Sequence, residues 1–138
     1  MMLRTKLAAF AGALILAGSA FSAQQAICPD INDIKAEGLS MAEEIGPNIY
    51  ISYNISDYNT PSTWGFLIAP IEGDSSEVAI DEANEILNTM TAPGIPEQDR
   101  NTTICLYDTG TQDVFAAAIQ SDGQLSPMKL KQYIRKAR

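Results

Sequence analysis

Aromatic side chains gather between Tyr50 and Phe66, and they are the most distinctive chemical feature of the sequence. Three of the five tyrosines, the only tryptophan and a phenylalanine fall in this stretch, around a polar loop from Ser56 to Thr63. Tyr50 lies opposite the isoleucines of its predicted strand and Tyr58 lies in the loop, so we expect both to be exposed. Exposed aromatics beside a loop are typical of a binding surface, although a strand or a core also favours aromatic residues.

The chain contains no histidine. This absence removes the usual general base, the Ser-His-Asp and Cys-His arrangements and nearly all common zinc sites. Asp108-Thr109-Gly110 matches the aspartic protease motif, but those enzymes need two such carboxylates and the chain has one copy. Asp and Gly also suit a hairpin turn, which is the interpretation we prefer. With no nucleophile–base pair to name, we expect no enzymatic activity.

Residues 1–22 have the pattern of a secretory signal peptide. Arg4 and Lys6 precede an apolar run from Leu7 to Ala17, and small residues follow. We prefer cleavage after Ser22 to cleavage after Ala20, and we rate an uncleaved anchor below both. The remaining residues, 23–138, have the length of one globular domain. We therefore expect a secreted, periplasmic or surface protein that does not span the membrane in its mature form.

Cys28 and Cys105 are the only cysteines. In an exported protein such a pair predicts a disulfide, and closing so long a loop contributes roughly 4 kcal/mol in the chain-entropy model. Their wide spacing argues against a redox motif.

The charge is strongly polarised along the chain. The formal net charge is −8, with 17 acidic and 9 basic side chains, which argues against nucleic-acid binding. Between residues 23 and 128 the only basic residues are Lys35 and Arg100. The last ten residues hold five more: Lys129, Lys131, Arg135, Lys136 and Arg138. We favour a solvated basic helix over a handle for an anionic ligand.

The hydrophobic periodicity predicts an α+β domain in the order α-β-β-α-β-β-α, an antiparallel sheet with helices packed on one face. A short helix is expected from Pro29 to Gly38, with up to two further helical turns from Leu39 to Ile45. Asp74 is expected to cap the second helix, whose apolar positions repeat as on one helix face. The remaining predictions are strands at 49–55, 64–71, 102–107 and 114–120, a loop at 91–100, and a last helix from Ser126 to about Lys136.

Three segments together resemble the small secreted haem-binding proteins of Legionella and related intracellular bacteria. They are Glu37-Gly38-Leu39-Ser40-Met41-Ala42-Glu43-Glu44-Ile45, Tyr50-Ile51-Ser52-Tyr53-Asn54-Ile55-Ser56-Asp57-Tyr58-Asn59-Thr60-Pro61-Ser62-Thr63-Trp64 and Cys105-Leu106-Tyr107-Asp108-Thr109-Gly110. The resemblance implies that the protein captures haem outside the cytoplasm for iron acquisition. Without histidine, the iron would be held by a Tyr phenolate or a Met thioether, or the haem by stacking alone.

The resemblance also directs attention to particular residues. Tyr58 and Tyr53 are the first candidates for iron ligands, with Tyr50 behind them and Met41 as a poorer candidate. Trp64 and the tyrosine rings would stack on the porphyrin. Lys35, Arg100 or the basic last helix would meet the propionates. A domain of this size has little room for an interior haem cavity, so the pocket is also expected to form between two chains of a homodimer.

A second hypothesis needs no haem. The same aromatic loop would then engage a host or envelope partner, and the protein would be a secreted interaction module.

Overall fold

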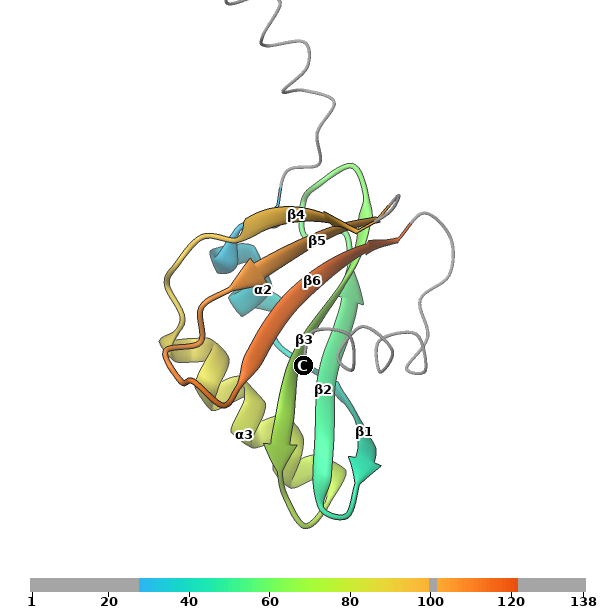
Figure 1. Cartoon of the computed structure of the whole chain (residues 1–138), viewed down its shortest axis with the longest axis vertical. Coiled ribbons are helices and arrows are strands. Elements are labelled where there is room, and N and C mark those ends of the chain that lie inside the picture. The colour runs from blue at the N-terminus through green and yellow to red at the C-terminus, as the bar shows by residue number, and fades with distance from the viewer. Residues whose placement is uncertain (1–27, 100–101, 122–138) are drawn as a thin grey trace, which may run out of the picture.

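The computed structural model describes residues 28–99 and 102–121 of the 138-residue chain. These residues form two helices and one six-stranded sheet, which confirms the predicted α+β class (Figure 1). The elements in chain order are α2 (Ile31–Glu37), β1 (Met41–Gly46), β2 (Ile49–Ser56), β3 (Thr63–Glu72), α3 (Ser76–Thr89), β4 (Ile95–Asp99), β5 (Thr102–Tyr107) and β6 (Phe115–Ser121).

The sheet is antiparallel throughout, with the strand order β1-β2-β3-β6-β5-β4. Strands β1 to β3 form one meander, which α2 precedes, and strands β4 to β6 form another, which α3 precedes. The two meanders meet where β3 pairs with β6. This central ladder runs from Thr63 opposite Ser121 to Ala69 opposite Phe115. β1 and β4 are therefore the two edges of the sheet.

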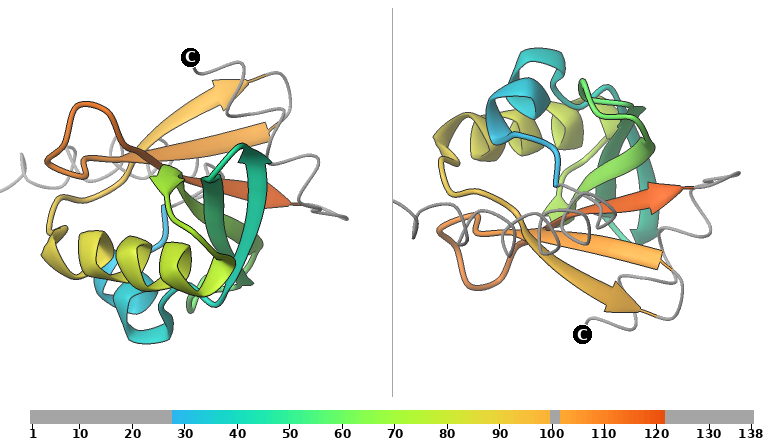
Figure 2. Two further views of the ribbon diagram at one scale, coloured as in Figure 1. Left: turned by 90° about the horizontal axis from the view of Figure 1, so that it is seen from below. Right: turned by 90° about the horizontal axis from the view of Figure 1, so that it is seen from above.

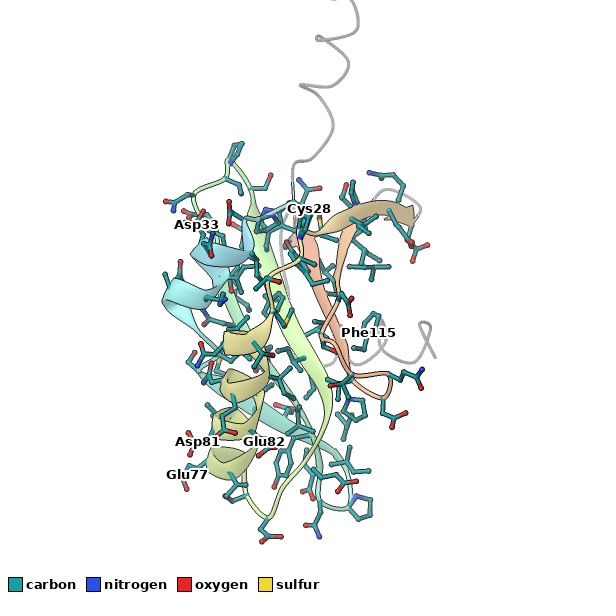
Figure 3. All side chains as sticks on the ribbon, turned by 90° about the vertical axis from the view of Figure 1, so that its left-hand side faces the viewer. Cys28, Asp33, Glu77, Asp81, Glu82 and Phe115 are labelled. Atoms are coloured by element: carbon teal, nitrogen blue, oxygen red, sulfur yellow. A yellow bond between two sulfur atoms is a disulfide. The ribbon has the colours of Figure 1, made fainter. Side chains whose placement is uncertain are left out.

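Both described helices pack on the same face of the sheet, which we call the helix face (Figure 2). Ala79, Ala83 and Leu87 of α3 are buried against it, which confirms the apolar face predicted for this helix. Glu77 and Asp81 lie along the outer side of α3 (Figure 3). The side chains that α2 and the sheet contribute to this core include Ile31, Ile34, Tyr50, Phe66, Ile68, Tyr107, Ala116 and Ala118.

The opposite face of the sheet, which we call the second face, carries its own apolar cluster. Ile51, Tyr53, Leu67, Ala69 and Ile119 are buried there, and Met41, Ile45, Ile104 and Phe115 pack around them. In Figure 3 the labelled Phe115 lies on the side of the sheet away from the helices. The central strands β2, β3 and β6 are thus buried on both faces.

Local hydrogen bonds explain where the helices begin. The Asp30 carboxylate accepts a hydrogen bond from the Asn32 N–H at 2.7 Å, and α2 ends at Gly38, whose φ is 75°. The Ser75 hydroxyl accepts a hydrogen bond from the Val78 N–H at 3.2 Å at the start of α3. The prediction of Asp74 as this cap was wrong by one residue, because Ser75 has the extended backbone that a capping residue needs.

Two predicted segments differ in type. The helical turns expected from Leu39 to Ile45 are wrong, because Met41–Gly46 is β1, paired with β2. Its Ala and Glu residues favour helices, but cross-strand pairing outweighs this weak preference. The loop expected at 91–100 contains β4, in which Pro96 is tolerated because β4 is an edge strand.

The predicted disulfide is confirmed, since Cys28 and Cys105 are bonded with their Cα atoms 5.7 Å apart. The turn predicted at Asp108-Thr109-Gly110 is also present. The Asp108 carboxylate accepts a hydrogen bond from the Gly110 N–H at 2.8 Å, and Gly110 has a φ of 81°.

The predicted signal peptide, Arg100 and the predicted last helix lie outside the described residues. Among the residues that the structure describes, no helix is long and apolar enough to cross a membrane.

Candidate functional site

The loop between β2 and β3 turns its tyrosine inward. Tyr58 and Asn59 both have positive φ values, 48° and 62°, and this backbone carries the Tyr58 ring into the core of the helix face. The ring is 1% exposed, and its hydroxyl donates to the Asn54 carbonyl at 3.4 Å. The expectation that Tyr58 is exposed was therefore wrong. A left-handed backbone is unfavourable for a bulky residue, so burial of the ring and local hydrogen bonds must offset it.

Trp64 and Tyr50 belong to the same core. The Trp64 indole N–H donates to the Thr60 hydroxyl at 2.9 Å, so the ring fixes the loop that precedes it. Tyr50 pairs with Ile71 and is 8% exposed, which makes the expectation of an exposed Tyr50 wrong as well. In this structure Tyr50, Tyr58 and Trp64 therefore pack as core residues of the helix face.

The second face brings two of the candidate residues together. Met41 and Tyr53 are direct partners in the β1–β2 register, so their side chains share one face of the sheet. Tyr53 pairs on its other side with Leu67, and both belong to the apolar cluster of that face. A phenol and a thioether are thus adjacent on an apolar surface.

The electrostatics around Tyr53 favour the neutral phenol. Burial raises the pKa of Tyr53, and the Glu43 carboxylate raises it further. Glu43 pairs with Ile51, which places it on the second face beside Met41. The sequence analysis did not identify Glu43 as a neighbour of Tyr53, because residues 39–45 were expected to be helical. Residues 41–45, Met-Ala-Glu-Glu-Ile, show no alternation of apolar and polar side chains, so the sequence offered no signal for this strand.

Of the cations proposed for the propionates, only Lys35 lies in the described part of the chain, and it belongs to α2 on the helix face. The Lys35 ammonium donates to the Met90 carbonyl at 2.8 Å, at the C-terminal end of α3, where a positive charge is favourable. Arg100 lies outside the described residues. Among the described residues there is no group of three or more His, Cys, Asp or Glu that could hold a metal ion. Tyr53 and Met41 are therefore the donor set that the described fold brings together.

These features define an α+β domain, closed by one disulfide, whose six-stranded sheet is apolar on both faces. The chain belongs to the family described as a domain of unknown function, DUF4949, whose model matches residues 27–133. The chain has no match among curated proteins or among solved structures.

Proposed function

We propose that this protein binds haem on the second face of its sheet and serves in haem and iron acquisition outside the cytoplasm. The observation that carries the proposal is the pairing of Tyr53 with Met41 within the apolar cluster of that face. The resemblance found in the sequence supports it, because both residues fall in the segments that carry the resemblance.

The chemistry of the second face suits a flat apolar ligand. Haem is planar and largely apolar, which matches the side chains of Ile51, Leu67 and Ile119. All three are buried in the structure, so haem would replace the layer that covers them. As an alternative to binding the iron, the Tyr53 ring can stack on the porphyrin. The disulfide supports the location, since such bonds persist in compartments outside the cytoplasm.

Tyr53 would hold the iron, with Met41 as the alternative ligand, because a planar haem lying on this face can take only one of two neighbouring side chains. Ferric iron is a hard cation, and its positive charge lowers the pKa of a phenol that binds it. Tyr53 would therefore give up its proton on binding, even though the apolar surroundings and Glu43 keep it neutral beforehand. The Met41 thioether is the softer ligand, and haem proteins use such thioethers as axial ligands.

The Tyr53→Phe variant tests the ligand assignment. We expect it to bind ferric haem at least about tenfold more weakly than the unchanged protein and to lose the phenolate-to-iron absorption band. Absorbance titration of the purified protein measures both effects. Tyr50→Phe is the matched control, because Tyr50 lies on the same strand but packs on the helix face. Equal spectra and affinities for the two variants would exclude Tyr53 as the ligand.

Haem binding is also expected to depend on pH through Tyr53. The ordinary pKa of a tyrosine is about 10 and that of Tyr53 is raised above it, so the free phenol is protonated near neutral pH. Binding as phenolate therefore releases one proton. The apparent affinity should then increase by up to about tenfold for each unit of rising pH between pH 7 and 9, beyond the pH dependence of free haem. Titrations with Tyr53→Phe should lack this increase, whereas Met41→Leu should keep it. An equal slope in all three proteins would contradict phenolate binding.

The stoichiometry from the same titrations tests whether the haem pocket forms between two chains of a homodimer, because such a pocket requires one haem for two chains.

A further inference from the structure

The second face is buried, although neither described helix lies on it. Ile51 and Leu67 have no exposed surface and Ile119 is 1% exposed, yet every member of their cluster comes from a strand. Neighbouring strands about 4.8 Å apart shield the flanks of a side chain but leave its tip open. Full burial therefore requires a layer above this face. The elements in the described ranges do not supply it, because α2 and α3 both pack on the helix face.

The second face has an apolar centre and acidic edges. Glu43 lies on the β1 edge, since it pairs with Ile51 of the second-face cluster. On the β4 edge, Glu97 pairs with Ile104 and therefore lies on the same face, as does Asp99 two residues further along the strand. A covering segment would suit this surface if it combined an apolar stripe with basic flanks.

The sequence that follows β6 has this pattern. Leu130, Tyr133, Ile134 and Ala137 recur at the spacing of one helix face, and the basic residues of the last ten positions fall on either side of it. A helix from Ser126 to about Lys136 would be about 16 Å long, enough to cross three or four strands. The chain also leaves the sheet from an internal strand, since β6 lies between β3 and β5. Residues 122–138 lie outside the described part of the chain, so this step rests on their sequence.

We propose that residues 125–137 of this same chain pack across the second face as an amphipathic helix. Its apolar stripe would cover Ile51, Leu67 and Ile119, and its basic flanks would face the acidic edges at Glu43 and Glu97. The sheet would then have helices on both faces. This docking does not depend on haem. One consequence does rest on the proposed function: haem is proposed for the same face, so haem and this helix would compete for it.

Two neighbouring alanines provide matched reporters for the test. Ala117 pairs with Leu67 of the second-face cluster, and Ala116 packs in the core of the helix face; each is 1% exposed. We would place Ala117→Cys or Ala116→Cys in the full chain and measure the rate of alkylation by iodoacetamide without reductant. The same measurement would be made with Leu130→Asp, on the apolar stripe, and with Gln132→Asp on its polar side.

Leu130→Asp is expected to speed alkylation at position 117 by at least about tenfold, because a local opening then exposes the second face. Gln132→Asp should not, and position 116 should stay slow with either substitution. Equal rates at position 117 with Leu130→Asp and Gln132→Asp would overturn the proposal. The proposal would also be overturned if alkylation at position 117 became fast on dilution of the protein, because the second face would then be covered by a second copy of the chain.

The cysteines at positions 116 and 117 distinguish general unfolding, which would expose both, from uncovering of the second face, which would expose position 117 alone. If Leu130→Asp speeds alkylation at both positions, the milder Leu130→Ala must speed it at position 117 alone. Failure to separate the two positions would overturn the proposal. None of these measurements uses haem, so they stand or fall separately from the titrations of Tyr53.

Discussion

Replacing Cys28 and Cys105 together by alanine is expected to lower the free energy of unfolding by about 4 kcal/mol. The bond joins positions separated by 77 residues, so without it the unfolded chain gains much conformational freedom. This is a large share of the total stability of a small domain, which is about 5–15 kcal/mol. Urea unfolding followed by circular dichroism measures the difference directly.

The design of the variant affects the size of the loss. Cys105 is fully buried, so serine there would add an unpaired hydroxyl and a separate cost, which alanine avoids. Reduction of the unchanged protein is the matched control and should shift its unfolding midpoint to near that of the double variant. The double variant itself should not respond to reductant. A midpoint within error of the oxidised protein would contradict the expected contribution of the bond.

Alkaline pH is expected to unfold the protein steeply. The pKa values of Tyr58 and Tyr107 are both raised, in each case mainly by burial. Asp30 and Tyr58 raise the pKa of Tyr107 further by repelling its charged form. Below pH 10 both tyrosines are protonated in the folded and unfolded chains, so neither makes stability depend on pH.

Above pH 10 the unfolded chain releases these protons while the folded chain keeps them. The free energy of unfolding should then fall by up to about 2.7 kcal/mol for each pH unit, or about 1.4 kcal/mol for each tyrosine. Urea unfolding at pH values between 9 and 12 gives the slope, with mass spectrometry to verify that the disulfide is intact. A free energy of unfolding that stays constant through this range would contradict the burial of both phenols.

Tyr107→Phe separates the two contributions. The Tyr107 hydroxyl donates to the Pro29 carbonyl at 2.6 Å, and its ring packs edge-on against Phe66 with centroids 5.6 Å apart. Gly94 leaves room for this ring, since a Cβ there would lie 2.6 Å from Tyr107 Cζ. Phenylalanine keeps the ring and removes the titrating hydroxyl, so the slope should fall by up to about 1.4 kcal/mol for each pH unit. At neutral pH the lost hydrogen bond should cost about 1 kcal/mol.

The sequence patterns that predicted structure correctly were local. The α3 repeat of apolar residues, the alternation in β2 and the turn at Asp108 each lie within a few neighbouring residues, so one segment suffices to detect them. The disulfide was predictable because the chain has a single pair of cysteines. Composition and periodicity together were enough for the α+β class.

The errors arose where distant partners decide the outcome. Met41–Gly46 contains good helix formers and becomes a strand only by pairing with β2. Pro93, Gly94 and Pro96 indicate a loop, and only the position of β4 at an edge permits a strand there. Tyr58 has the polar neighbours of an exposed residue, but two consecutive left-handed residues turn its ring inward.

The candidate site was only partly predictable for the same reason. The tyrosines of 50–58 are close in sequence, but β2 sends Tyr50 and Tyr53 to opposite faces of the sheet. The partnership of Tyr53 with Met41 follows from the β1–β2 register, which the sequence did not indicate once 39–45 was expected to be helical.

The meeting of the two meanders at β3 and β6 has a consequence for how the domain is held together. Every other ladder joins strands that are consecutive in the chain, so only the β3–β6 ladder pairs strands that are distant in sequence. The β3–β6 ladder is the seam between the two halves of the domain, and Cys28 with Cys105 ties the first half to the second across it. The covalent tie therefore links the two meanders independently of the ladder through which their strands pair.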